Sequence, residues 1–546
     1  MSNGFFSAPP AQNEPIKSYI EGSPERRELR AALRHLHAQE TEIPLVLGDR
    51  KVMTPQTSRV VSPHAHRKEI ARHALATVEH VHGAIQSAVD AQRSWSSMPW
   101  WDRAAIFLKA ADLLAGPYRA EMNAATMMGQ SKTIFQAEID AACELADFWR
   151  FNVAYMERIY KDQPLSTPGT WNRVSYRGLE GFVFAVTPFN FTSVALNLAS
   201  APALMGSTVV WKPAHTALLA NWVGLKILEE AGLPPGVINM VMGDPQQIGQ
   251  TVLRHRDLAG IHFTGSTNTF NTLWAQVGQN IAHYRTYPRL VGETGGKDFI
   301  MAHPSADLAA LETALIRGAF EYQGQKCSAA SRAYIPASLW KKLKDPLLEK
   351  VAALKMGTPE DFSNFLGAVI DDKAFNRIHK ALETVRHSSE AKILVGGEAQ
   401  SDEGYFIRPT IVEAAKADYF TMKEELFGPV LTVHVFDDRN FDDVLAQCEA
   451  TSPYGLTGAI FAQDRRVIGD MTARLEYAAG NFYINDKPTG AMVGQQPFGG
   501  SRASGTNDKA GSALNLLRWT SVRTLKETFV PPRSYEYPFM AGNPLT

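Results

Sequence analysis

Short apolar runs alternate with longer helix-like stretches from residue 181 onward, and this alternation limits the fold more than any other feature. GFVFAVTPFN (181–190) is a short apolar run that ends at a proline turn, and STVVWKP (207–213) repeats the pattern. TALLANWVGLKILEEAG (216–232) follows, with apolar residues at helical spacing and a glycine as stop signal. Strands and helices that alternate at this spacing predict an α/β fold with a parallel sheet of the nucleotide-binding type.

A chain of 546 residues is too long for one small hydrophobic core, so two or more domains are expected. Hydrophobic residues make up 45% of the chain and charged residues 20%, which is ordinary for a globular protein. The net charge of -1 gives no electrostatic reason to expect nucleic acid or an anionic membrane as partner. No apolar stretch is long and uninterrupted enough to predict a membrane span.

The cysteines, at positions 143, 327 and 448, form no C-x-x-C pair, so neither a disulfide framework nor a thiolate zinc site is expected. A reducing compartment fits this pattern best. Histidines gather at positions 64, 66, 73, 80 and 82, but metal binding needs ligands that converge on one point. A solvated N-terminal face explains the cluster as well, and no metal is expected.

EYQGQKCSAASR (321–332) places Cys327 directly after Lys326 and ahead of Arg332. A thiol attacks as its thiolate, and nearby positive charge stabilises the thiolate, so this stretch is a candidate nucleophile loop. A lone cysteine is also a common small buried apolar residue. On this stretch alone both interpretations stay open.

The signals for phosphate binding are mixed. No G-x-G-x-x-G motif lies near the predicted strands, and GETGGKD (292–298) lacks P-loop spacing and has Asp298 in place of the hydroxyl residue, which argues against ATP hydrolysis. In HFTGSTNTFNTLW (262–274), Ser266 can cap a helix that starts at a strand end. The free N–H groups and positive dipole at such a helix start suit a pyrophosphate.

Several stretches, in the same order along the chain, resemble motifs of the aldehyde dehydrogenase family: TPFNF (187–191), WKPA (211–214), FTGS (263–266), GETGGKD (292–298), GQKCSA (324–329), EELFGPV (424–430) and QPFGG (496–500). The resemblance implies the aldehyde dehydrogenase fold in three parts. These are a Rossmann-like NAD-binding domain (1–157 and 179–297), an α/β catalytic domain (298–512) and a β-strand oligomerisation arm (158–178 and 513–546).

The resemblance also implies roles for residues in these motifs. Cys327 would attack the aldehyde carbon to form a thiohemiacetal and then a thioester, Glu293 would be the general base, and Asn190 would donate to the oxyanion. The implied cofactor is NAD, bound by Thr187, Pro188, Lys212, His215, Gly265, Ser266, Glu425 and Phe427. His215 stands where many NAD-preferring members carry an acid, so some use of NADP stays open.

Further stretches, including EGSPERRELRAAL and LRWTSVRTLKET, resemble the branch of the family that oxidises L-glutamate γ-semialdehyde, formed from 1-pyrroline-5-carboxylate, to L-glutamate in proline catabolism. For that substrate, Ser328 and the backbone of Gly490 and Ala491 would bind the carboxylate. Phe191 and Phe498 would sandwich the aliphatic carbons. Glu144 would pair with the ammonium; a solvated helix acid is the alternative interpretation of Glu144.

Three rival functions remain open on the sequence. The chain could be an NAD(P)-dependent dehydrogenase for another semialdehyde, such as succinic semialdehyde. It could also be a thiol hydrolase that uses Cys327 and Asn190, or a non-catalytic protein on a dehydrogenase scaffold. The third rival has no need for Cys327, Glu293 and Asn190 together.

The expected assembly is a homodimer or a higher homo-oligomer, because an arm with exposed strand edges invites pairing with another subunit. The expected partner besides the small-molecule substrate is a separate proline dehydrogenase, with no nucleic acid and no membrane. A cytoplasmic location is expected, with the mitochondrial matrix, for a mature chain, as the alternative.

Overall fold

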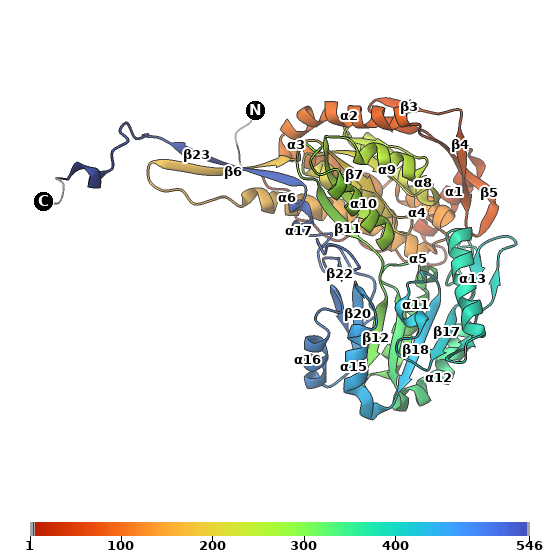
Figure 1. Cartoon of the computed structure of the whole chain (residues 1–546). Coiled ribbons are helices and arrows are strands. Elements are labelled where there is room, and N and C mark those ends of the chain that lie inside the picture. The colour runs from red at the N-terminus through yellow and green to blue at the C-terminus, as the bar shows by residue number, and fades with distance from the viewer. Residues whose placement is uncertain (1–3, 5, 543–546) are drawn as a thin grey trace.

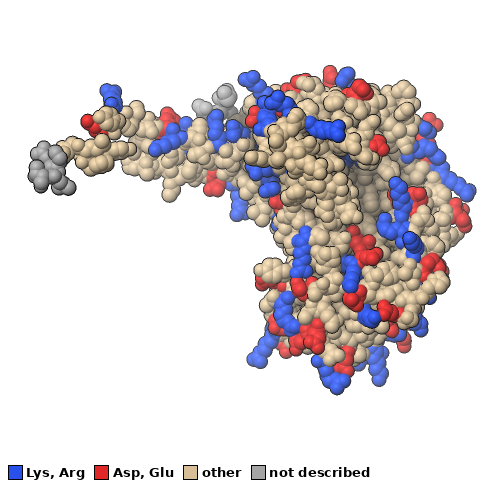
Figure 2. All heavy atoms as spheres, in the orientation of Figure 1, with Lys and Arg blue, Asp and Glu red and all other residues tan. Residues whose placement is uncertain are grey.

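The computed structural model describes residue 4 and residues 6–542, which form two lobes and a thin arm (Figure 1). Figure 2 shows the arm as a narrow extension of the body, with acidic and basic side chains interspersed over the visible face. None of the helices in the described part of the chain has both the length and the apolar content that crossing a bilayer requires.

The first lobe contains a seven-stranded sheet in the order β11-β10-β7-β8-β9-β2-β3. Its strands are β2 (Leu45–Leu47), β3 (Arg50–Val52), β7 (Phe182–Val186), β8 (Thr208–Lys212), β9 (Ile238–Met240), β10 (Leu258–Thr264) and β11 (Arg289–Glu293). The five strands from β7 to β11 are parallel, which confirms the predicted parallel sheet. Strands β2 and β3 extend one edge in antiparallel pairing, which the sequence pattern did not predict.

Helices pack around this sheet. They are α1 (Pro24–Ala38), α2 (Val78–Ser97), α3 (Trp100–Ala115), α4 (Arg119–Gln130), α5 (Ile134–Ala137), the π-helix η1 (Glu138–Glu144), α6 (Leu145–Lys161), α7 (Thr192–Leu204), η2 (His215–Ala217), α8 (Leu218–Ala231), α9 (Pro245–Leu253), α10 (Thr267–Gln279) and α17 (Ala513–Leu517). A small sheet of β1 (Glu42–Ile43), β5 (Ala65–Ala74) and β4 (Thr57–Ser62) borders this lobe.

The second lobe is built on another seven-stranded sheet, in the order β14-β17-β18-β13-β12-β20-β21. Its strands are β12 (Asp298–Ala302), β13 (Ala330–Pro336), β14 (Ala391–Val395), β17 (Thr410–Ala414), β18 (Val430–Phe436), β20 (Thr457–Phe461) and β21 (Asn481–Ile484). Along β12, Phe299 and Met301 belong to one core cluster and Ile300 and Ala302 to another. The sheet is therefore buried on both faces, as expected of a mainly parallel sheet.

The helices and short strands of the second lobe flank this sheet. The helices are α11 (Leu308–Phe320), η3 (Glu321–Gly324), α12 (Ala337–Ala352), α13 (Asp372–Arg386), α14 (Phe420–Lys423), η4 (Asp438–Asn440), α15 (Phe441–Ala450) and α16 (Arg465–Arg474). The short strands pair as β15 (Ala399–Gln400) with β16 (Phe406–Ile407) and β19 (Tyr454–Gly455) with β22 (Ser501–Arg502).

The arm is a two-stranded antiparallel ribbon of β6 (Thr170–Gly178) and β23 (Thr520–Thr528), followed by the short helix η5 (Pro538–Ala541). Residues 158–161 form the last turn of α6, and Leu516 and Trp519 are buried in the core of the first lobe. The ribbon itself starts at Thr170 in the first segment of the expected arm (158–178) and at Thr520 in the second segment (513–546). Trp171, Val522 and Phe529 are exposed on it.

The histidine-rich segment is only partly a solvated face. His73 is buried, and the His64 ring lies in hydrogen-bonding range of the Ser131 hydroxyl, with 3.1 Å between Nδ1 and Oγ. Burial lowers the pKa of His64 to about 4. No group of three or more metal-ligating side chains converges within the described residues.

Candidate functional site

Three predicted nucleotide-binding residues and the predicted general base lie where parallel strands of the first sheet end. Thr187 follows β7, Lys212 ends β8, Ser266 follows β10, and Glu293 ends β11. Strand β7 lies between β8 and β10, so the order of the strands reverses there. Ligands of open α/β sheets bind at the carboxyl ends of strands at such a reversal, and the structure brings these residues to that edge.

Lys212 and Ser266 supply positive potential at this edge. Burial lowers the pKa of Lys212, and no hydrogen bond or ion pair to its ammonium is found among the described residues. Ser266 caps α10 by accepting from the Thr269 N–H at 3.2 Å. A half-buried cation without a partner among the described residues and a helix start together suit an anionic ligand such as a pyrophosphate.

The other predicted residues of this edge differ in what they contact. The Thr187 hydroxyl accepts from the Trp211 Nε1–H at 2.9 Å, and Pro188 follows it into the loop after β7. His215 starts the helix η2 with an exposed side chain, and partial desolvation lowers its pKa. The Gly265 N–H donates to the Glu293 carbonyl at 3.1 Å, which ties the ends of β10 and β11 together.

Glu425 and Phe427 approach the site from the second lobe. The Glu425 carboxylate accepts from the Gly296 N–H at 2.8 Å, and burial raises its pKa to about 7. A Cβ added to Gly295 would lie 2.2 Å from Glu425 Oε2, so a larger residue there would displace this carboxylate. Phe427 has a left-handed backbone with φ of 53°, and its ring centroid lies 5.8 Å from that of Phe189.

The loop before Cys327 is strained and firmly held. Tyr322, Gln323 and Gly324 have φ values of 51°, 54° and 65°, a left-handed run that non-glycine residues rarely adopt. The Gln323 amide donates to the carbonyls of Ser131 at 3.1 Å and Ala368 at 2.7 Å. Strain of this kind persists only where surrounding contacts enforce it, and it is typical of functional loops.

Asn190 is buried and reaches the same loop from the end of β7. Its Nδ2–H donates to the Gln325 carbonyl at 3.1 Å, two residues before Cys327. A side-chain amide has two N–H groups, so the second can serve an oxygen bound at Cys327. This arrangement can stabilise an oxyanion.

The predicted stabilisation of the Cys327 thiolate by Lys326 and Arg332 is wrong. The Lys326 ammonium lies 3.3 Å from Glu321 Oε2, and the Arg332 guanidinium donates to the Lys297 carbonyl at 2.8 Å. Both cations are therefore engaged by other groups. Burial, followed by the nearby Asp298 carboxyl, raises the pKa of Cys327 well above its usual value.

Glu293 is the third group of the proposed reacting set. Its Oε2 is buried, with no hydrogen-bond partner among the described residues. Burial raises its pKa well above the usual range for a glutamate. A buried carboxyl without a partner points to a water or ligand at that position.

A loop of the second lobe contacts the residue that follows Cys327. The Ser328 and Thr489 hydroxyls lie 2.7 Å apart, and Gly490 and Ala491 follow Thr489 in the chain. Gly490 has φ of 95°, a conformation that favours glycine. Phe498 exchanges backbone hydrogen bonds with Ala510 at 3.0 and 2.7 Å, so its position is fixed.

Glu144, at the end of η1, is not a solvated helix acid. It accepts from the Ser193 hydroxyl at 2.6 Å, and burial raises its pKa to about 8. Sequence reasoning missed its buried neighbours Lys132 and Asp140, whose charged atoms lie 2.6 Å apart. The Lys132 ammonium also lies 4.5 Å from the centroid of the Phe191 ring. No local sequence pattern marks these two residues, because they meet only through tertiary packing.

Comparisons with known proteins agree with this geometry. The sequence matches the aldehyde dehydrogenase family over residues 52–525. The mitochondrial Δ1-pyrroline-5-carboxylate dehydrogenase of Bos taurus is 51% identical over 529 residues, which cover 97% of this chain and 94% of that protein.

Two solved structures extend the comparison. The Δ-pyrroline-5-carboxylate dehydrogenase of Mycobacterium tuberculosis, bound with NAD, matches with a TM-score of 0.96 and 52% identity, covering 99% of this chain and 100% of that one. Proline utilization A of Bdellovibrio bacteriovorus matches with a TM-score of 0.89 and 28% identity, covering 96% of this chain and 54% of that one.

Proposed function

The chain belongs to the aldehyde dehydrogenase family, and we propose that it oxidises L-glutamate γ-semialdehyde to L-glutamate with NAD. The semialdehyde is the open-chain form of 1-pyrroline-5-carboxylate, so the reaction is a step of proline catabolism. The observation that carries this proposal is the likeness, over nearly the whole chain, to proteins named as dehydrogenases of pyrroline-5-carboxylate.

Cys327, Asn190 and Glu293 carry the chemistry. The Cys327 sulfur attacks the aldehyde carbon, and the resulting oxyanion, stabilised by the Asn190 amide, takes a proton to give a thiohemiacetal. Loss of a hydride from carbon and of the hydroxyl proton converts this adduct to a thioester. Glu293 then takes a proton from water, which attacks the thioester and releases the carboxylic acid and the thiol.

NAD, when bound, supplies the hydride acceptor. The residues at the carboxyl edge of the first sheet suit it: Lys212 and His215 for the adenosine ribose, and Thr187, Pro188, Gly265 and Ser266 near the phosphates. Glu425 and Phe427, from the second lobe, suit the nicotinamide end. We accordingly assign NAD binding to residues 1–157 and 179–297 and the nucleophile to residues 298–512. His215 does not repel a 2′-phosphate as an acid would, so NADP is a permitted second cofactor.

The substrate's amino-acid end faces the other side of Cys327. Ser328 and the backbone N–H groups of Gly490 and Ala491 bind its carboxylate, and Phe191 and Phe498 enclose its carbons. Glu144 pairs with the ammonium, and this opposite charge favours the ionised carboxylate.

We propose that the arm mediates a homodimer or a larger homo-oligomer, because its ribbon exposes strand edges and apolar side chains. A separate proline dehydrogenase is the proposed source of the substrate. The name of the bovine relative supports the mitochondrial matrix for this chain; the cytoplasm is the alternative.

The test follows NADH at 340 nm with purified protein, NAD and pyrroline-5-carboxylate. We expect turnover with this substrate at a kcat/KM at least about tenfold above that for succinic semialdehyde, which lacks the amino group. Faster turnover of succinic semialdehyde would replace the proposed substrate but keep the enzyme class. No NADH formation with any aldehyde would contradict both the proposed substrate and the enzyme class.

A further inference from the structure

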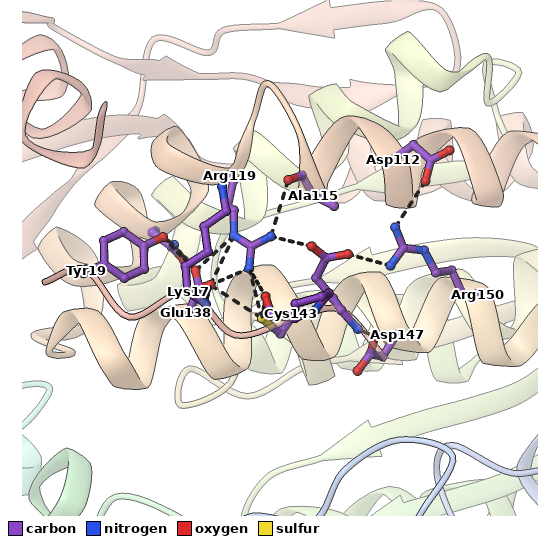
Figure 3. Close-up of polar contacts among 12 residues, drawn as sticks. Lys17, Tyr19, Asp112, Ala115, Arg119, Glu138, Cys143, Asp147 and Arg150 are labelled. Atoms are coloured by element: carbon purple, nitrogen blue, oxygen red, sulfur yellow. Dashed lines mark hydrogen bonds and ion pairs between the residues drawn. The ribbon is translucent and has the colours of Figure 1, made fainter. Parts of the chain in front are cut away.

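The N-terminal strap (residues 8–19) has no helix or strand, yet it is held against the first lobe by buried charged groups. Arg119 of α4 pairs with Glu14 of the strap at 2.5 Å and with Glu138 of η1. Arg150 of α6 pairs with the other Glu14 oxygen at 2.7 Å. Figure 3 shows Arg119 and Arg150 pointing towards each other on either side of the carboxylate that joins them.

The far end of the strap is held in the same way. The Lys17 N–H donates to Glu138 Oε1 and the Tyr19 hydroxyl to Glu138 Oε2, both at 2.8 Å (Figure 3). The exposed fraction of the Glu138 side chain is 0%, so these contacts are shielded from water. Buried charge-assisted hydrogen bonds are strong, and the strap is therefore a fixed part of the lobe rather than a loose end.

Between these anchors, Asn13 connects the strap to the carboxylate loop (residues 490–496). Its Nδ2 donates to Asp147 Oδ2 of α6 and to the Val493 carbonyl, both at 2.8 Å. Its Oδ1 accepts from the Gln495 Nε2–H at 3.1 Å. One side-chain amide thus joins helix α6, the strap and the loop.

The carboxylate loop has little else to hold it. It contains no helix or strand, and Met492 and the residues at 494–496 are exposed. Within it, backbone bonds from Gln495 and Gln496 to the Met492 carbonyl close a turn. The Met492 N–H also donates to Gln496 Oε1 at 2.9 Å. The other anchors are the contact between the Ser328 and Thr489 hydroxyls just before the loop, the buried Val493 side chain and the close approach of Gly494 to the Phe151 ring. A loop that must present free N–H groups cannot use them for its own support.

We propose that Asn13 is a positioning residue for substrate specificity: it holds the carboxylate loop so that the N–H groups of Gly490 and Ala491 meet the α-carboxylate. This inference rests on the proposed function. It also implies that the strap, far away in sequence, helps to select an amino-acid aldehyde over a simple one.

The experiment compares Asn13→Ala with Gln12→Ala, the neighbouring amide, which is exposed and has no hydrogen bond from its side chain in the described structure. Pyrroline-5-carboxylate and propanal, which lacks a carboxylate, are the two substrates. Loss of the two loop contacts predicts a KM for pyrroline-5-carboxylate about tenfold higher in Asn13→Ala. The kcat/KM for propanal and the KM for NAD stay within about twofold, and Gln12→Ala matches the wild type.

Amide hydrogen exchange over residues 487–497 provides a readout that needs no substrate. Asn13→Ala should exchange faster than wild type and Gln12→Ala in this segment, with the exchange of the β7 and β8 peptides unchanged. Equal losses with both aldehydes, or unchanged exchange in the loop, would overturn the proposal. If the wild type fails to oxidise pyrroline-5-carboxylate, the proposed function is wrong. The exchange rate of the loop in Asn13→Ala then still decides whether Asn13 holds the loop: faster exchange supports this, and unchanged exchange contradicts it.

Discussion

Two buried polar regions of this molecule handle charge in opposite ways. In the clamp (Glu14, Arg119, Glu138 and Arg150), each charged group has a partner of opposite sign. In the candidate catalytic site, Glu293 Oε2 is buried without a hydrogen-bond partner, and the half-buried Lys212 ammonium has no ion pair, within the described structure. The pKa values of the two glutamates reflect this difference. Hydrogen bonds and the charge of Arg119 outweigh burial and lower the pKa of Glu138, whereas burial raises the pKa of Glu293 well above its usual value.

The difference in charge pairing distinguishes a region that stabilises the fold from a region that can bind a ligand or react. A buried charge without a partner is costly, so a protein that needs only stability pairs such groups or replaces them. Unpaired groups persist where a ligand or a reaction completes them, and perturbed pKa values gather at such sites. We therefore propose that the clamp maintains the fold and that the candidate catalytic site performs the chemistry.

The largest effect is expected for Cys327→Ala. Removing the nucleophile should lower kcat for NADH formation at least about a thousandfold, while the free energy of unfolding changes little. The control is Cys448→Ala: Cys448 is buried in the core of the second lobe, so this variant should lose stability and keep activity. Steady-state rates and urea denaturation measure the two effects. Equal kcat losses in both variants would contradict the assignment of Cys327 as the nucleophile.

Arg119→Leu tests the clamp. It leaves the Glu14 and Glu138 carboxylates buried without this partner, and the expected loss in the free energy of unfolding is about 3–5 kcal/mol. Arg72→Leu, which breaks an exposed ion pair with Glu69, should cost at most about 1 kcal/mol. Urea titrations of both variants provide the comparison. A loss below about 1 kcal/mol in Arg119→Leu would mean that the clamp is not structural.

Glu144→Gln tests the comparison of paired and unpaired carboxyls within the π-helix η1, because Glu138 and Glu144 lie at its two ends. Glu138 has its partner in the protein, whereas Glu144 is proposed to find its partner in the substrate ammonium. The variant should raise the KM for pyrroline-5-carboxylate about tenfold and leave succinic semialdehyde unaffected. Equal changes for both substrates would remove the proposed role of Glu144.

The smallest effect concerns the pH dependence of Cys327 alkylation in the protein without NAD. Its raised pKa means that less of the reactive thiolate is present at neutral pH than for a free cysteine. Iodoacetamide should therefore label Cys327 slowly at pH 7, and the rate should still be rising above pH 9. A plateau below pH 8, measured by peptide mass spectrometry, would show that a positive charge does act on the thiol.

The sequence pattern predicted the parts of the fold that repeat. Strands β7, β8 and β10 are buried on both faces of a parallel sheet, so each is a short apolar run that can be recognised without knowledge of its neighbours. Strands β2 and β3 have three residues each, too few for an alternation to show. Their antiparallel pairing depends on contacts distant in the sequence.

The candidate site divides in the same way. Cys327, Glu293 and Asn190 belong to motifs that sequence comparison can recognise, and the Asn190 amide donates to the Gln325 carbonyl in the loop that carries Cys327. The charge environment of Cys327 could not be predicted, because Arg332 is drawn away by a carbonyl of Lys297, more than thirty residues earlier. Likewise, Asn13 and Val493 lie at opposite ends of the chain, and only the folded structure shows that they touch.

The most direct test of the central claim is a single-turnover experiment on Glu293→Gln with excess NAD and pyrroline-5-carboxylate. The account predicts that Cys327 still reacts but that the thioester is not hydrolysed. NADH should therefore appear in a burst of about one equivalent per active site, and mass spectrometry should find the acyl group on Cys327. Steady turnover without a burst, or an acyl group on another residue, would contradict it.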